Sequence, residues 1–150
     1  MRFEKSLGLL ITVLFVALPW AQAQQTGDSP ITVYKTPTCN CCSAWVEYLE
    51  DEGFAVTTHD LPDLTKVKVK HGLTDPKLAS CHTAIIDGYV VEGHVPADDI
   101  RRLLRERPPL VGITAPGMPQ QSPGMFSRDP KGYDVLGFDA DGKVSVFSRY

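Results

Sequence analysis

The sequence lacks a run of apolar residues long enough to cross a membrane as a helix. Its most apolar stretch, residues 7–18, spans about twelve positions, whereas roughly 20 are needed to cross the hydrocarbon core. Two cations precede this stretch, and a small-x-small tripeptide ending at Ala23 follows it. This order predicts a secretory signal peptide over residues 1–23, cleaved after Ala23. No cysteine follows the tripeptide directly, which argues against lipoprotein processing.

The sequence also lacks a basic cluster, and its formal net charge is −3. A mildly acidic chain of this kind is a poor match for nucleic acid or for an anionic membrane surface. We therefore expect no nucleic-acid partner, and no membrane partner once the signal peptide is removed. Residues 24–30 are polar and predict a flexible lead-in, and residues 31–150 have the length of a single ordinary domain.

Cysteines are few, and their spacing is unusual. Cys39, Cys41 and Cys42 fall within four residues, and Cys81 follows much later. In an oxidising compartment four cysteines favour two disulfides. Only Cys39 and Cys42 form a comfortable local pair, because a bridge between the adjacent Cys41 and Cys42 would be strained. Cys41 and Cys81 are left either to pair with each other or to serve another purpose.

The pattern of apolar residues and turn signals predicts an α/β protein. It indicates strands over residues 31–35 and 54–60, helices over 43–52, 62–71 and 95–107, and hairpins over 82–94 and 133–150. The Pro/Gly/Ser-rich segment 108–132 carries no predicted element. This order is typical of a thioredoxin-like fold, with a central mixed sheet flanked by helices and a C-terminal loop and hairpin extension. The first two strands should then be parallel, joined by a right-handed crossover.

This fold would gather the cysteines. The first three lie where a strand ends and a helix begins, and a helix N-terminus favours thiolate over thiol. Cys81 immediately precedes the predicted hairpin, which in a thioredoxin-like arrangement lies against that helix start. We therefore expect four sulfurs to converge. With only one comfortable local pair among them, such a cluster suits a soft metal better than two disulfides.

The other potential ligands favour copper over zinc or iron. Met118 and Met125 each follow a Pro-Gly pair in the loop segment, and His94 ends a predicted strand. Soft thiolate and thioether ligands point to Cu(I), and adjacent thiolates can bridge more than one copper ion. Zinc sites use two C-x2–4-C pairs, of which this sequence has one. His82 is expected to point to the opposite face of its strand, away from Cys81.

Four segments carry a resemblance to a known family, namely VYKTPTCNCC, LASCHTAII, EGHVPAD and PGMP. They resemble the family of domain of unknown function 411, which includes CopG-like periplasmic copper-resistance proteins, over residues 31–125. The resemblance implies a thioredoxin-like fold and a periplasmic role in copper resistance, with interconversion of Cu(I) and Cu(II) as one activity. It implies copper ligands at Cys39, Cys41, Cys42 and Cys81, with His94, Met118 and Met125 as the further motif positions.

Three other functions stay open at this point. A thiol–disulfide oxidoreductase would attack with Cys39 and resolve with Cys42, although Cys81-His82 stands where thioredoxins hold substrate chains with a proline. A copper store or chaperone, handing metal to other periplasmic copper-handling proteins, would use every ligand of the leading hypothesis. A structural domain with two disulfides would use none of this chemistry.

Overall fold

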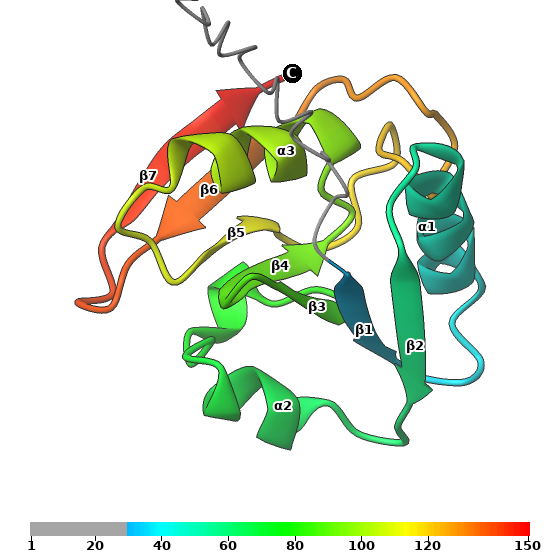
Figure 1. Cartoon of the computed structure of the whole chain (residues 1–150), viewed down its shortest axis with the longest axis horizontal. Coiled ribbons are helices and arrows are strands. Elements are labelled where there is room, and N and C mark those ends of the chain that lie inside the picture. Colours follow the sequence, from blue (N-terminus) through cyan, green and yellow to red (C-terminus); the bar gives the residue numbers. More distant parts are fainter. Residues whose placement is uncertain (1–29) are drawn as a thin grey trace, which may run out of the picture.

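The computed structural model describes residues 30–150, so the predicted signal peptide, 1–23, and residues 24–29 of the lead-in lie outside the described residues. Figure 1 shows a mixed α/β arrangement. The strands are β1 (Ile31–Lys35), β2 (Val56–Asp60), β3 (Thr83–Ile86), β4 (Tyr89–Gly93), β5 (Gly112–Ala115), β6 (Asp134–Phe138) and β7 (Val144–Arg149). The helices are α1 (Asn40–Asp51), α2 (Thr65–Lys70) and α3 (Ala97–Glu106), with a short 3-10 turn at Pro76–Leu78.

All seven strands form one sheet in the order β2-β1-β3-β4-β5-β6-β7. As predicted, β1 and β2 are parallel, and the β3–β4 hairpin continues the sheet antiparallel to β1. Asp87 and Gly88 form the hairpin turn with φ values of 51° and 86°, and two consecutive positive φ angles are what a tight two-residue hairpin requires. The C-terminal hairpin β6–β7 is confirmed as an extension of the same sheet, joined to it through β5.

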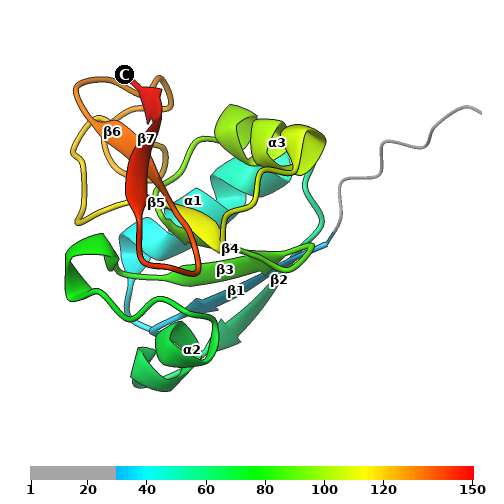
Figure 2. The same cartoon turned by 90° about the vertical axis from the view of Figure 1, so that its left-hand side faces the viewer.

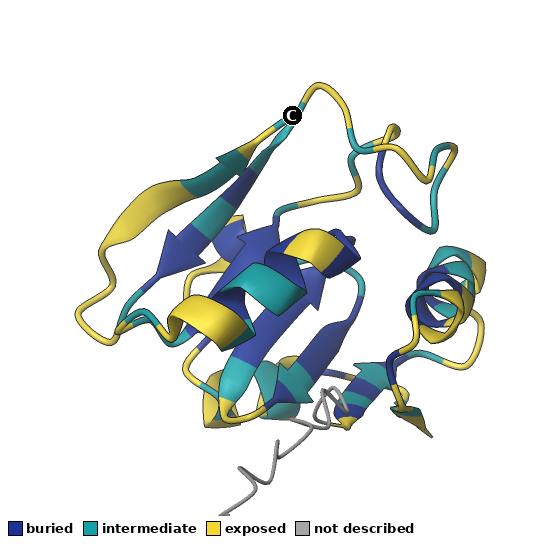
Figure 3. Cartoon of the chain, turned by 45° about the horizontal axis from the view of Figure 1, so that its top comes forward, coloured by how far each residue is buried: buried dark blue, intermediate teal, exposed yellow. Residues whose placement is uncertain are grey.

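Helices cover both faces of the sheet. Figure 2 shows α1 and α3 on one face and α2 on the other. Side chains alternate between the two faces along β4: Val91 belongs to the larger core under α1 and α3, whereas Val90 belongs to a smaller core that also contains Leu73 and Leu78. The central strands are the most deeply buried part of the chain (Figure 3).

Helices α1 and α3 are joined by side chains that fix the start of α3. The indole N–H of Trp45 donates to the carbonyl of Val95 over 2.9 Å, and the amide of Ala97 donates to the hydroxyl of Tyr48 over 3.0 Å. Trp45 is fully buried in the core. These contacts hold α1, and the cysteines at its beginning, in a defined position relative to the loop after β4.

The segment 108–132 differs from the prediction. It contains a strand, β5, which pairs with β4 in parallel and with β6 in antiparallel orientation. Alternation could not reveal this strand, because all four of its residues are buried. Gly112 is required there, since a Cβ atom at this position would lie 2.2 Å from the carbonyl oxygen of Val90.

Two helices begin three residues away from the predicted position. Helix α1 begins at Asn40 rather than residue 43, so its first turn includes Cys41 and Cys42. Helix α2 is shorter than the predicted 62–71, because Asp63 accepts hydrogen bonds from the backbone and hydroxyl of Thr65 and thereby sets the start of the helix. Within residues 30–150, none of the helices combines the length and the apolar character that a membrane crossing demands.

Candidate metal centre

The beginning of α1 positions three of the four cysteines. Cys39 is the N-cap residue, and its carbonyl accepts hydrogen bonds from the amide (3.1 Å) and the hydroxyl (3.3 Å) of Ser43. Cys39 and Cys42, one helical turn apart, form a disulfide. Cys41 lies between them as a free, half-buried thiol. The comfortable local pair is therefore oxidised in this structure, and the thiol without a local partner remains free.

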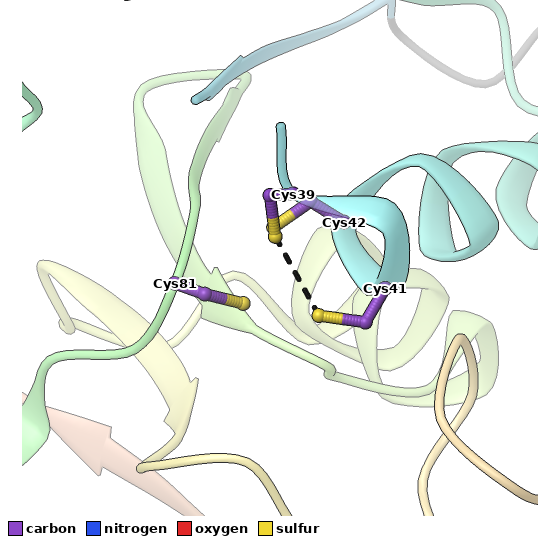
Figure 4. A group of neighbouring side chains, drawn as sticks. All are labelled: Cys39, Cys41, Cys42 and Cys81. Atoms are coloured by element: carbon purple, nitrogen blue, oxygen red, sulfur yellow. Dashed lines mark hydrogen bonds between the residues drawn. A yellow bond between two sulfur atoms is a disulfide. The ribbon is translucent and has the colours of Figure 1, made fainter. Parts of the chain in front are cut away.

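Cys81 completes the cluster, as predicted. The four Sγ atoms of the cysteines all lie within 4.8 Å of one another. Figure 4 shows Cys81 pointing from the segment before β3 toward the start of α1, and the dashed line marks the 3.5 Å between the sulfurs of Cys39 and Cys41. Cys81 is free, so the structure contains one disulfide among residues 30–150 rather than two. The alternative of a purely structural pair of disulfides does not describe this arrangement.

The Cys81 thiol lies in an environment that opposes its ionisation. Burial raises the pKa of Cys81 to about 11, and the proximity of Cys41 adds to the increase because two thiolates repel each other. Two half-buried thiols that repel each other as anions would be stabilised by a cation between them. A bound metal supplies that positive charge, and it displaces the thiol proton when it binds.

Two histidines also face Cys81. Its Sγ lies 3.3 Å from Nε2 of His94 and 3.4 Å from Nδ1 of His82, and these three ligand atoms form a second group within 4.8 Å. His94, one of the further motif positions in the sequence, lies beside the cluster. The expectation for His82 is wrong. Residue 82 precedes β3, which begins at Thr83, so the alternation of side chains along a strand does not apply to it.

The surroundings of the two rings suit metal ligation. Nδ1 of His94 lies 2.8 Å from the carbonyl oxygen of Pro123, which can only accept a hydrogen bond, so Nδ1 carries the proton and the Nε2 lone pair faces Cys81. His82 is fully buried against Trp45, and its Nε2 has no hydrogen-bond partner among the described residues. Desolvation lowers the pKa of both histidines, most strongly for His82, which keeps the rings neutral.

The two methionines lie in the loop between β5 and β6, at different depths. Met125 is half-buried and lines a groove with Cys41, Ala44 and Phe126. The loop approaches α1 closely here, since a Cβ atom on Gly124 would lie 2.9 Å from the carbonyl oxygen of Cys41. Met118 is 55% exposed, and the structure does not bring it into the group of cysteines. It follows Gly117, whose amide donates to the carbonyl of Ala79.

The buried histidines should make the metal-free protein less stable in mild acid. A histidine whose pKa is lower in the folded than in the unfolded state favours unfolding as the pH falls below about 6.5, because the unfolded chain then binds more protons. If the pKa of a histidine is one unit lower in the folded than in the unfolded state, its protonation lowers the free energy of unfolding by up to about 1.4 kcal/mol. We expect the free energy of unfolding in urea to fall between about pH 7 and pH 5, and to fall less in a His82→Phe variant.

Comparing the wild type with the His82→Phe variant isolates the contribution of His82 to the pH dependence of stability. Glu92 and Asp99 have pKa values raised by burial, so they act in the opposite direction in this range, but they are present in both proteins. Equal slopes of stability against pH for the wild type and the variant would contradict the proposed effect of His82.

Comparison with known proteins places the chain in a family. The model of the family described as "Protein of unknown function, DUF411" matches residues 78–125. Two solved structures, named "Copper resistance protein copG- Form 1" and "Form 2", each share 45% sequence identity with the chain and superpose with a TM-score of 0.75. Each match covers 82% of this chain and 98% of the copG chain. No curated protein sequence matches the chain. As its sequence motifs predicted, the chain belongs to the DUF411 family, together with the copper resistance protein copG.

Proposed function

We propose that this protein binds copper in the periplasm and serves copper resistance or homeostasis, using Cys39, Cys41, Cys42 and Cys81 as its central ligands. The observation that carries the proposal is the convergence of four sulfur atoms within 4.8 Å, two of them free thiols. The similarity to the copper resistance protein copG supports copper as the metal. The predicted signal peptide supports export, after which other periplasmic copper-handling proteins are the natural partners.

The composition of the cluster favours Cu(I) when all four cysteines are reduced. Thiolates are soft ligands and select Cu(I) over hard divalent ions. Met125, in the groove beside Cys41, and Met118, on the exposed part of the same loop, would add soft thioether ligands near the cluster. We propose both as ligands during loading, with Met118 the more accessible to incoming copper.

Two ligand groups share Cys81, which supports more than one bound ion. The first contains the four cysteines, and the second contains Cys81, His82 and His94. In a tetrahedral first-row metal site with bonds of about 2.0 Å to nitrogen and 2.3 Å to sulfur, neighbouring N and S ligand atoms lie roughly 3.5 Å apart. The observed separations of 3.3 and 3.4 Å fit this spacing. Two imidazoles and one thiolate also suit Cu(II) better than four thiolates do.

Formation or reduction of the Cys39–Cys42 disulfide would change which side chains are free to bind copper. When the disulfide is formed, the remaining donors are Cys41, Cys81 and the two histidines, a mixed set that favours Cu(II). When it is reduced, four thiolates favour Cu(I). Passing from the reduced state with two Cu(I) ions to the disulfide state with two Cu(II) ions would release four electrons: two from the Cys39 and Cys42 thiolates as the S–S bond forms, and one from each copper ion. Dioxygen would serve as the oxidant, because one molecule accepts four electrons and four protons and forms two molecules of water.

The disulfide also favours a second candidate, thiol–disulfide exchange. Cys39 and Cys42 form a C-x-x-C pair at the start of α1, and α1 connects the parallel strands β1 and β2. This arrangement supports the thioredoxin-like fold proposed from the sequence. The free Cys41 and Cys81 beside the pair have no role in that reaction. Reduction of insulin by the metal-free protein tests it, and robust turnover without copper would favour this function over copper handling.

Anaerobic titration of the reduced protein with Cu(I), in competition with a chromophoric chelator, tests the main proposal. We expect more than one copper ion per chain, and complete loss of tight binding when all four cysteines are replaced by serine. A Ser43→Ala variant, altered in the same helical turn but not in a ligand, should bind copper as the wild type does. Less than one ion per wild-type chain would contradict the proposal.

A further inference from the structure

A buried ion pair lies behind Cys81, on the opposite face of the sheet from α1. Glu92 of β4 is fully buried, and its carboxylate pairs with the ammonium group of Lys68 from α2. The same carboxylate accepts hydrogen bonds from the Ser80 amide over 2.6 Å and from the Thr83 hydroxyl over 2.7 Å. Removing two such charges from water is costly, so a buried pair persists where additional hydrogen bonds compensate for it.

The hydrogen bonds of this group converge on Ser80. The Lys68 ammonium donates to three acceptors, which are Glu92, the Thr83 hydroxyl (2.9 Å) and the Ser80 carbonyl (3.2 Å). The amide and the carbonyl of Ser80 are therefore both held, the first by Glu92 and the second by Lys68. That carbonyl belongs to the peptide bond that joins Ser80 to Cys81.

The regular sheet does little to position Ser80. It lies outside the strands of residues 30–150, and its backbone forms an isolated bridge to Gly117, just beyond the end of β5, supported by a hydrogen bond from its hydroxyl to the Gly117 carbonyl. Gly93, which follows Glu92, lets the segment come close, since a Cβ atom there would lie 2.6 Å from the Ser80 side chain. Hydrogen bonds from the side chains of Glu92 and Lys68 therefore hold the backbone of Ser80, where a strand would be held by backbone hydrogen bonds to its neighbours.

We infer that Glu92 and Lys68 are positioning residues for the metal centre: they hold the Ser80–Cys81 peptide so that the Cys81 sulfur faces both the other cysteines and the two histidines. Cys81 belongs to both ligand groups, so a displacement of its backbone weakens both. This inference rests on the proposed copper function for its purpose, but the positioning itself does not require metal. A change outside the ligand shell that disturbs ligand orientation typically lowers metal affinity about 10- to 100-fold.

The rate at which iodoacetamide alkylates Cys81 in the metal-free, disulfide-bonded protein tests the inference, with Cys81 and Cys41 resolved by peptide mass spectrometry. The main variant is Lys68→Met/Glu92→Leu, which removes both charges so that neither is left buried alone. We expect Cys81 alkylation to rise at least about tenfold, because the segment opens locally. Cys41 should react at its wild-type rate.

Three further variants separate positioning from general destabilisation. Glu92→Gln keeps a carbonyl oxygen for the Ser80 amide and should stay within about threefold of the wild-type rate. Asp99→Asn alters another buried carboxylate, which holds Ser148 and Tyr150 instead, and should leave Cys81 labelling unchanged even where it lowers stability. If the double variant does not fold, Lys68→Met alone should still raise Cys81 labelling about threefold or more. It removes the donor to the Ser80 carbonyl, the Thr83 hydroxyl and Glu92, but keeps the hydrogen bond from the Ser80 amide to Glu92.

A folded double variant whose Cys81 reacts at the wild-type rate would overturn the inference. A rise equalled by Asp99→Asn would overturn it too, since the cause would then be lost stability. In Cu(I) titrations the double variant should show about 10- to 100-fold weaker binding. The labelling uses metal-free protein, so a failure of the copper proposal in the wild-type titration is recognised separately from a failure of this inference.

Discussion

Replacing Cys81 with serine should reduce copper binding more than replacing any other single cysteine. Cys81 is the one residue that both ligand groups contain, so its loss removes a thiolate from each. The serine hydroxyl is a hard, neutral donor that does not substitute for a thiolate toward copper. We expect the affinity for Cu(I) to fall by about 100-fold or more, beyond the range typical of changes outside the ligand shell.

Cys39→Ser provides the matched comparison. It removes one of four sulfurs and leaves Cys81, His82 and His94 complete. In reduced, anaerobic protein titrated with Cu(I), the Cys39→Ser variant should keep the group of Cys81, His82 and His94 and should therefore bind copper more tightly than Cys81→Ser does. Circular dichroism verifies that both variants fold. Equal copper stoichiometry and affinity in the two variants would show that Cys81 is not shared between sites.

Replacing Gly93 with alanine should cause the largest loss of stability at a single site near the metal centre. Gly93 has φ of +73°, and a Cβ atom there would lie 2.6 Å from the Ser80 side chain and 2.7 Å from the carbonyl oxygen of Ala115. A residue with a side chain costs about 1 kcal/mol in this left-handed conformation, and overpacking adds roughly 1–3 kcal/mol. We expect urea unfolding to show a loss of about 3 kcal/mol.

A Gly88→Ala variant separates the cost of the left-handed backbone conformation from the cost of overpacking. Gly88 has a similar φ of +86°, but a Cβ atom there would have no neighbour within 4 Å. This variant should lose only the conformational part, about 1 kcal/mol. The Gly93 variant should also expose Cys81 to alkylation, because Ser80 must move to make room. Equal losses in the two variants would mean that the close approach of Ser80 to β4 contributes nothing.

The sequence predicted the structure best where a short local pattern identifies an element and the usual connections between such elements place it in the fold. A β-branched strand followed by cysteines at a helix start correctly predicted β1, α1 and the parallel pairing with β2. The position of Cys81 just before a hairpin correctly predicted that its sulfur would meet the other three. In both cases a short-range pattern indicated an element, and the usual connections between such elements supplied the tertiary contact.

Other parts of the site could not be read from local patterns. The expectation that His82 faces away from Cys81 is wrong, because the alternation of side chains does not extend to a residue that precedes the strand. Strand β5 gives no signal in the sequence, because a four-residue strand buried on both faces shows no alternation. The pairing of Lys68 with Glu92 joins residues 24 positions apart on different elements, and a lysine on a short, largely exposed helix gives no sequence signal that its ammonium group is held by a buried carboxylate.

The most direct test of the central claim is the copper content of the protein purified without chelator from copper-supplied cells, measured together with the oxidation state of the metal by X-ray absorption. We predict more than one copper ion per chain. We also predict Cu(I) with predominantly sulfur ligands in reduced protein, and Cu(II) with nitrogen and sulfur ligands once the Cys39–Cys42 disulfide has formed. Substoichiometric copper, or a ligand environment that stays the same in the two thiol states, would contradict the account.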